Sequence, residues 1–231
     1  MNNGAEPSAA PPYRQIRAHY DDHFITVYQA YKSSIAEAAV ATQKLNAAPD
    51  FRPGRMTWIK PSWSWMMYRA GYGFKDPGQA HILAIKMRHQ HFLGLLERGV
   101  LSTESQGARE PPEARRDKKD GPKPRTKDVR IQWDPERTPQ LHQLPYRSIQ
   151  IGIPGDISDV WAREWIAEII DVTEMAKALK NALDERPELT VQELIDMGLV
   201  PSERPYHVPE DIRSRLEMTE VSHTLDERDS V

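Results

Sequence analysis

Residues 55–72 read R-M-T-W-I-K-P-S-W-S-W-M-M-Y-R-A-G-Y and show how this chain alternates between strands and helices. The first six residues are rich in β-branched and aromatic types, which favours a strand that Pro61 stops. Ser62 stands where a helix N-cap belongs, and Gly71 is suited to end the helix that follows. The stretch therefore predicts a strand, a proline break and a helix in direct succession.

The same alternation extends along the chain in both directions. Periodicity predicts further strands over residues 23–30, 79–87, 129–133, 147–153 and 167–172. It predicts further helices over residues 35–47, 88–99, 159–166 (capped by Ser158) and 174–183, and a short one after the capping box at 190–193. Interspersed elements favour an α+β, or mixed α/β, class, and the alternating polarity of several strands favours a mixed or largely antiparallel sheet flanked by helices. A doubly wound nucleotide fold fits less well, because neither G-x-G-x-x-G nor G-x-x-x-x-G-K-[ST] occurs.

Composition limits the classes of protein that this chain can belong to. Its 231 residues suit one domain, and 39% hydrophobic with 28% charged residues allows a core with a strongly solvated surface. No window approaches the ~18 apolar residues of a membrane span, and no basic-then-apolar leader is present, so we expect a soluble cytoplasmic protein without membrane contact. Cysteine is absent, which excludes disulfides and thiolate chemistry. The net charge of −3 provides no global attraction to nucleic acid.

Three segments are expected to lie outside the packed core. Residues 1–12 are small, polar and proline-rich, which is typical of a disordered tail. Residues 103–128 contain almost nothing apolar and predict a charged, flexible loop within a single domain spanning residues 13–200. Within that loop, residues 114–127 hold seven basic and two acidic residues, so contact with nucleic acid through it stays open. Residues 201–231 are read as an acidic C-terminal extension.

The opening stretch also contains the densest group of candidate binding residues. Lys60, Ser62, Trp65 and Arg69 surround the expected start of a helix, whose free amides and partial positive charge attract anions. Trp65 and Arg69 are four residues apart, so an indole and a guanidinium share one helix face and suit a planar, negatively charged ligand. The alternative is that the tryptophans and methionines of this stretch form core and that Arg69 pairs with a surface carboxylate.

A second group of candidates lies near the N-terminus. Arg14 and Arg17 are three residues apart, and Tyr28 lies in the middle of the first long strand. Arginines held against a sheet can bind a phosphate through two parallel hydrogen bonds. The alternative is an N-terminal arm that salt bridges hold in place. We assign no metal ligands, because His89 and His91 point in different directions on a helix and H-E-x-x-H is missing.

The chain resembles a known family through several long motifs. These are R-Q-I-R-A-x-Y-D (14–21), I-T-V-Y-Q-A-Y (25–31), R-M-T-W-I-K-P-S (55–62), W-M-M-Y-R-x-G (65–71) and R-S-I-Q-I-G (147–152). They are similar to the family called domain of unknown function 4291, over about residues 13–183. The family name supplies no reaction.

That resemblance implies a weaker, fold-level analogy with ADP-ribosyltransferase-like folds, in which a basic residue, a strand tyrosine, a serine before a helix and a late polar residue hold a dinucleotide. The corresponding residues here are Arg17, Tyr28, Ser62 and Gln150. A late-strand glutamate in the place of the catalytic acid is not evident. A fold-level analogy does not establish function.

Two hypotheses of function follow. The first is a pocket that binds a nucleotide or a phosphate, which would suit a transferase that acts on a nucleotide or an NAD-like dinucleotide. Its catalytic residue is unknown. Its ligand-binding candidates are Arg17, Tyr28, Lys60, Ser62, Trp65, Arg69 and Gln150. The second is a non-catalytic module that docks a protein or RNA through exposed tryptophans or through the basic loop.

Overall fold

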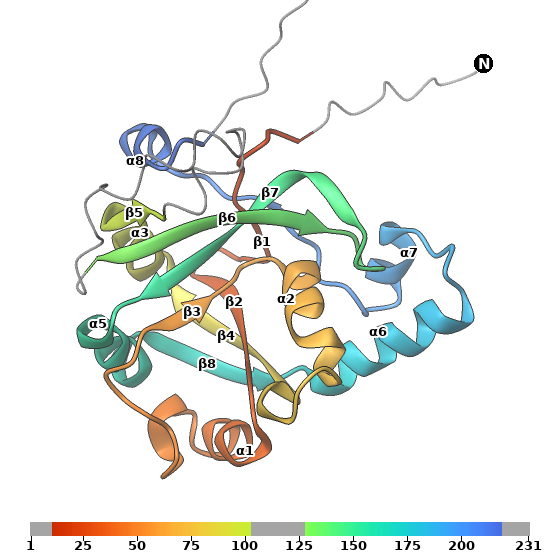
Figure 1. Ribbon diagram of the computed structural model, residues 1–231, viewed down its shortest axis with the longest axis horizontal. Helices are drawn as coiled ribbons and strands as arrows, with labels where there is room; N and C mark the ends of the chain where they lie inside the picture. The colour runs from red at the N-terminus through yellow and green to blue at the C-terminus, as the bar shows by residue number, and fades with distance from the viewer. Residues whose placement is uncertain (1–10, 103–127, 219–231) are drawn as a thin grey trace, which may run out of the picture.

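A computed structural model describes residues 11–102 and 128–218, so most of the expected N-terminal tail and charged loop lies outside the described residues (Figure 1). Within this part of the chain, one antiparallel sheet has the order β2 (Phe24–Tyr31), β4 (His81–Arg88), β8 (Ile166–Asp171). A second has the order β3 (Thr57–Ile59), β7 (Gln143–Ile153), β6 (Val129–Arg137), β5 (Gly99–Leu101), and only β5 pairs in parallel. Strands β1 (Arg17–Ala18) and β9 (Arg204–Pro205) form a third pair. The predicted α+β class with a mixed, largely antiparallel sheet is confirmed.

Helices pack around the two larger sheets (Figure 1). They are α1 (Ser33–Thr42), α2 (Trp63–Ala70), α3 (His89–Glu97), α5 (Gly155–Val160), α6 (Thr173–Glu185), α7 (Val191–Asp196) and α8 (Glu210–Arg215). A π-helical turn, Trp161–Trp165, continues α5, and single 3₁₀ turns lie at Leu45–Ala47, Gly71–Gly73 and Pro77–Gln79. None of the helices in the described residues is long and apolar enough to cross a membrane.

The core has two parts, one on each side of the β2–β4 pair. Ile25 and Val27 of β2 face the second sheet, where they join Ile149 and Ile151 of β7 in the larger cluster. Tyr28 faces the other way and packs in a second cluster with residues of α2 and α6. The sheets meet where the Tyr28 backbone N–H donates to the Lys60 carbonyl at 2.7 Å. This contact fixes the end of β3, and therefore the start of α2, against the middle of β2.

Two local expectations were wrong. The helix predicted over 35–47 ends at Thr42, because Gln43 adopts a left-handed φ of 57°. The Gln43 side-chain amide then hydrogen-bonds both the N–H and the C=O of Ile169 in β8. Ser158 does not cap a helix; it lies inside α5 and donates a hydrogen bond to the Arg55 carbonyl at 2.8 Å. The side chains of both residues hydrogen-bond to backbone groups that are distant in sequence, and local propensity does not predict such contacts.

The chain beyond residue 200, read from sequence as an extension, contributes directly to the fold. Tyr206, Val208, Ile212 and Leu216 are buried in the larger cluster. β9 pairs with β1, so the C-terminal segment closes over the N-terminal one. The packed structure therefore continues to at least Leu216.

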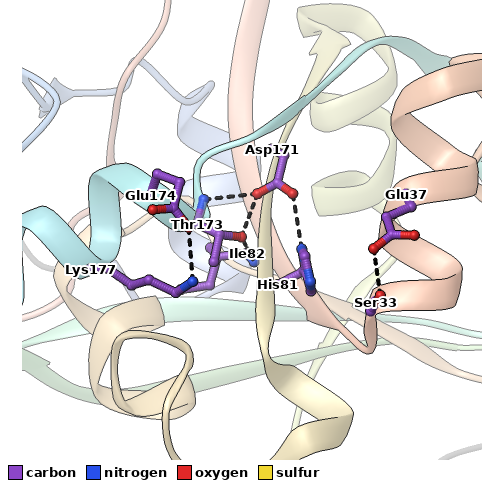
Figure 2. A network of polar contacts seen from close by, with 8 residues as sticks. All are labelled: Ser33, Glu37, His81, Ile82, Asp171, Thr173, Glu174 and Lys177. Carbon is purple, nitrogen blue, oxygen red and sulfur yellow. Dashed lines mark hydrogen bonds and ion pairs between the residues drawn. The ribbon is translucent and has the colours of Figure 1, made fainter.

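A buried hydroxyl joins β4, β8 and α6 in the polar network of Figure 2. Thr173 Oγ1 accepts the Ile82 backbone N–H at 2.9 Å and donates to Asp171, whose carboxylate also accepts the Thr173 N–H at 2.9 Å. The His81 ring contacts the same carboxylate at 3.0 Å. Burial alone would raise the pKa of Asp171, but the hydrogen bonds from Thr173 and His81 outweigh it and lower that pKa.

We expect Thr173→Val to lower the free energy of unfolding by about 1–3 kcal/mol, because it leaves the buried Ile82 N–H without an acceptor. Urea denaturation at pH 7 measures this loss. Lys177→Met is the matched control in the same helix, since its pair with Glu174 is exposed and should change stability by less than about 0.5 kcal/mol. Equal effects of the two substitutions would contradict the role assigned to the hydroxyl.

Candidate functional site

The predicted start of α2 is confirmed. Pro61 ends the strand, Ser62 takes an extended conformation with ψ 123°, and its Oγ accepts the Trp65 N–H at 3.1 Å. The helix ends at Gly71, whose φ of 56° is in the left-handed region that glycine adopts without strain. Local sequence signals were sufficient here because each residue acts on its immediate neighbours.

Carboxyl groups of the protein itself occupy the anion-binding end of α2. Ser62 Oγ donates to Glu136 Oε1 at 2.9 Å, and the Trp63 N–H donates to Glu203 Oε1 at 2.6 Å. Glu136 comes from the end of β6 and Glu203 from the segment before β9. An external anion was predicted at this position, so an incoming ligand has to bind beside these carboxyls or displace them.

A cavity of about 280 Å³ opens beside the two carboxyls. Its polar wall contains Arg17, Ser62, Glu136, Arg137, Tyr146 and Glu203. Its apolar wall comes from the β6–β7 hairpin, from α7 and from the segment after it, with Leu144, Val191, Ile195 and Val200. Figure 1 shows α2, the β6–β7 hairpin and α7 gathered around this region. Two arginines, two carboxyls and several hydroxyls therefore face one enclosed space, which we call the Glu136 cavity.

Glu136 has the electrostatic character of a proton-exchanging group. Its side chain is 6% exposed, and burial raises its pKa from 4.5 to about 7. Hydrogen bonds from the Arg137 N–H (2.8 Å) and Ser62, together with the charge of Arg17, limit this rise. Both of these hydrogen bonds reach Oε1, and the nearby Ser148 hydroxyl limits the rise in the pKa of Glu136 further. Near neutral pH this carboxyl both gives and accepts protons readily.

Burial also acts on Glu203. It raises the pKa of Glu203 well above 4.5, the nearby Glu136 raises it further, and the Trp63 N–H and the charge of Arg17 lower it only in part. Arg17 also donates to the Glu203 backbone carbonyl at 3.2 Å. Two neighbouring carboxyls with raised pKa values, beside an arginine, are an arrangement found in acid–base catalysis.

Arg17 and Ser62 are the two sequence-predicted residues that line the Glu136 cavity. Tyr28 lies beneath it: its ring packs edge-on against Trp63 at 5.3 Å, and it is close enough to Glu203 for that carboxyl to help burial raise its pKa. With 2% exposure, Tyr28 presents no face on which a base or nicotinamide could stack.

The other four candidates gather further along the open face of the second sheet. The Lys60 ammonium lies 5.3 Å from the Trp65 ring centroid. Burial and then the charge of Arg69 lower its pKa from 10.5 to about 7, and the opposite charge of Asp134 offsets only part of this shift. Gln150 on β7 donates a hydrogen bond to Asp134 on β6. Arg69 is exposed and makes no hydrogen bond or ion pair with the described residues. The seven candidates therefore fall into two adjacent groups around α2.

The core interpretation of the tryptophans holds for two of them. Trp63 and Trp65 are 0% and 6% exposed, and Met66 and Met67 are buried with them. These residues offer no surface to a protein or RNA partner. The basic segment at 114–127 lies outside the described residues. Arg14 forms an ion pair with Glu217, as expected for an N-terminal arm held by salt bridges.

Sequence reasoning missed both carboxyls of the cavity. Glu136 continues the pattern in which every second residue of the strand, Gln132 and Asp134, is polar. Pro135 suggested that the strand ends before Glu136. In the structure Pro135 lies at a register shift, where a strand tolerates proline. Glu203 carries no local signal, because its partner Trp63 is 140 residues away.

The profile of one family, described as Domain of unknown function (DUF4291), matches residues 15–206 of this chain. A search of the curated proteins finds no match. These comparisons give no support to the analogy with ADP-ribosyltransferase-like folds. The matched range begins before Arg17 and ends after Glu203, so it contains all the polar residues of the Glu136 cavity.

Proposed function

We propose that this protein, which belongs to the DUF4291 family, is an enzyme that acts on a nucleotide or a similar small phosphate ester. The family description names no reaction, so the proposal rests on the geometry of the site. The Glu136 cavity binds the phosphate group, and Glu136 acts as general acid or base. The observation that carries the proposal is the buried carboxyl with a pKa of about 7, aimed into a cavity beside two arginines. Strongly perturbed carboxyls in clefts are typical of active sites.

Arginine is the residue suited to the phosphate. Among the residues that the structure describes, the Arg17 guanidinium donates to the Gln15 side chain and to the Glu203 backbone carbonyl, at 3.3 and 3.2 Å, and forms no direct ion pair with the cavity carboxyls. The Arg137 guanidinium stacks on Tyr68 at 3.8 Å, and its buried Nε has no hydrogen-bond partner in the described residues. Two arginines line the cavity, and burial of the two carboxyls favours their uncharged forms. The cavity therefore favours an anion, and protonation of Glu136 strengthens that preference.

The volume of the cavity limits the ligand. Pockets for drug-sized ligands occupy about 300–1,000 Å³, and this one has about 280 Å³. A phosphate with an attached sugar is of suitable size, whereas an NAD-like dinucleotide would have to leave much of its length outside. Nucleotides and sugar phosphates are abundant in the cytoplasm, the location expected from the sequence. Gln150, which is partly exposed on the adjacent sheet face, is the sequence-predicted residue that we expect to contact the part that protrudes, whereas Lys60 is 6% exposed.

Anion binding should weaken as pH rises. Sulfate is the probe, because it keeps both charges between pH 6 and 8, and chloride at equal ionic strength is the reference. Ionisation of Glu136 through its pKa of about 7 should reduce sulfate affinity about tenfold between pH 6 and pH 8. Calorimetry measures the affinity directly. Glu136→Gln should bind sulfate equally at both pH values.

Two further variants identify the cation. Arg17→Met should lose sulfate binding, while Arg98→Met, which removes an exposed arginine far from the cavity, should keep it. Arg17→Lys keeps the charge without the planar fork and should bind with intermediate affinity. Sulfate binding that is independent of pH and of Arg17 would contradict the proposed site.

Turnover tests the enzymatic part separately. Phosphorus NMR follows ATP, AMP and NAD incubated with the protein, and we expect one of them to be converted. General acid–base catalysis contributes about 10²–10⁴-fold, so Glu136→Gln should reduce that rate at least 100-fold. If none is converted, the protein is a binding module for these ligands rather than an enzyme that acts on them.

A further inference from the structure

A second cavity, of about 510 Å³, lies at the opposite end of β3, away from α2. It is bounded by the end of β2, the start of α1, the segment from Pro49 to Thr57 and Ser158 of α5. Tyr31, Ile35, Phe51 and Met56 give it aromatic and aliphatic walls, and the Tyr31 and Phe51 rings lie 6.5 Å apart. We call it the Arg52 cavity. Its volume is within the range of small-molecule sites.

Two arginines stand side by side at this cavity. Residues 52–55 read Arg-Pro-Gly-Arg, and Pro53 and Gly54 occupy a turn in which Gly54 has a φ of 70°. Such turns bring their flanking residues to within about 7 Å of each other. Arg52 and Arg55 are both exposed cavity-lining residues. Neither forms a hydrogen bond or ion pair through its side chain with any residue in 11–102 or 128–218.

Backbone contacts, not the arginine side chains, hold the turn in place. Ser158 Oγ donates to the Arg55 carbonyl at 2.8 Å. Gly155 packs so closely on the turn that a Cβ at this position would lie 2.0 Å from the Gly54 carbonyl oxygen. The fold therefore requires Gly54, Gly155 and Ser158 but makes no use of either guanidinium.

The acid that lines the cavity is already neutralised. Asp50 forms an ion pair with Lys32 and accepts the Ser34 hydroxyl at 2.8 Å. The hydrogen bonds from Lys32 and then Ser34 lower the pKa of Asp50, so it is ionised at neutral pH. Of the four charged lining residues three are cations, which leaves the charges of Arg52 and Arg55 uncompensated.

The side-chain oxygens of the lining residues Tyr31 and Thr57 are satisfied by Gln29, which does not itself line the cavity. Gln29 is 4% exposed; its Nε2 donates to Thr57 Oγ1 at 2.7 Å, and its Oε1 accepts the Tyr31 hydroxyl at 2.8 Å. A ligand therefore meets aromatic and aliphatic surface inside and two free guanidiniums at the turn. This combination matches a molecule with a flat ring at one end and a phosphate at the other.

We propose that the Arg52 cavity is a second ligand site, which binds a mononucleotide with its phosphate on Arg52 and Arg55 and its base against Tyr31 and Phe51. The site is separate from the Glu136 cavity and does not rest on the function proposed there. Because arginine does not titrate near neutral pH, only the second ionisation of the phosphate, at about pH 6, changes the affinity of this site between pH 6 and 8. Mononucleotide binding should therefore strengthen slightly as pH rises, whereas anion binding in the Glu136 cavity should weaken.

Calorimetry and amide NMR with AMP, inorganic phosphate and adenosine as probes test this site at constant salt. AMP should bind more tightly than either fragment and shift the amide signals of Gly54 and Gly155. The double variant Arg52→Gln/Arg55→Gln should weaken this binding at least about tenfold. The control Arg98→Gln/Arg186→Gln makes the same change in net charge at exposed positions elsewhere and should leave it unchanged.

The outcomes separate the two sites. Arg17→Lys should weaken sulfate binding at the Glu136 cavity but leave the Gly54 and Gly155 shifts with AMP intact. The second site is overturned if the double variant binds AMP like the wild type, or if AMP moves only signals around Trp65 and Glu203. Phosphate binding as tightly as AMP would overturn the role given to the aromatic walls.

Discussion

Replacing Glu136 with glutamine should make the protein about 3 kcal/mol more stable at pH 8.5 and change its stability by less than about 1 kcal/mol at pH 5. Burial raises the pKa of Glu136 from 4.5 to about 7. Between these values the folded state binds more protons than the unfolded state. Wild-type stability is therefore highest below pH 4.5 with respect to this group, and it falls as pH rises to 7.

Urea denaturation at pH 5, 7 and 8.5 measures the free energy of unfolding of the variant and of the wild type. Groups that titrate equally in both proteins do not affect the difference between the two free energies. Glutamine keeps an oxygen that accepts from Ser62 and Arg137, so the local hydrogen bonds persist. Glu168→Gln, on an exposed position of β8, is the control and should show no comparable pH dependence. A Glu136→Gln protein that is less stable at every pH would show that the carboxylate is stabilising and that its pKa is not raised.

Lys60→Met should have the larger effect, with the opposite dependence on pH. Burial and the charge of Arg69 lower the pKa of Lys60 from 10.5 to about 7. Here the unfolded state binds more protons between pH 7 and 10.5, so wild-type stability rises with pH over this range and is lost as pH falls. The variant should be about 4 kcal/mol more stable than wild type at pH 6, and the gain should shrink below about 1 kcal/mol at pH 10.

Urea denaturation at pH 6, 8 and 10 checks this prediction, with Lys177→Met as an exposed control on α6. The Lys60 ammonium donates only a 3.4 Å hydrogen bond to the Trp58 carbonyl, so methionine removes little besides the charge. A gain that is constant across pH would indicate that packing, not ionisation, is responsible. If removing Glu136 and Lys60 both stabilises the protein, their retention fits a functional site, where stability and activity oppose each other.

The elements around this site were predictable where the signal was local. The β3–α2 succession follows from Pro61, Ser62 and Gly71, because each of them acts within one helical turn. The region was also identified correctly as polar and unusual, and Ser62 and Arg17 do line a cavity. Composition and periodicity were sufficient for the α+β class.

What was missed depends on contacts between distant segments. Glu203 meets Trp63, and Gln150 pairs with Asp134, only after the sheet has formed. Gln43 ends a helix of good intrinsic propensity because β8 offers it a backbone partner. The Arg52 cavity likewise depends on the packing of Gly155 against Gly54. The local sequence of neither segment predicts this contact.

The pairing of β1 with β9 has a consequence for the order in which a nascent chain matures. Arg17 and Ala18 leave the ribosome early, yet their partners Pro205 and Arg204 are synthesised much later. At a translation rate of about 5–20 residues per second, β9 is synthesised roughly 10–40 s after β1. The larger sheets can form during this interval, but the Glu136 cavity remains unfinished, because Arg17 and Glu203 are brought together only by this final closure. Translation that stops before residue 203 would therefore release a protein that has its larger sheets and Glu136 but lacks Glu203.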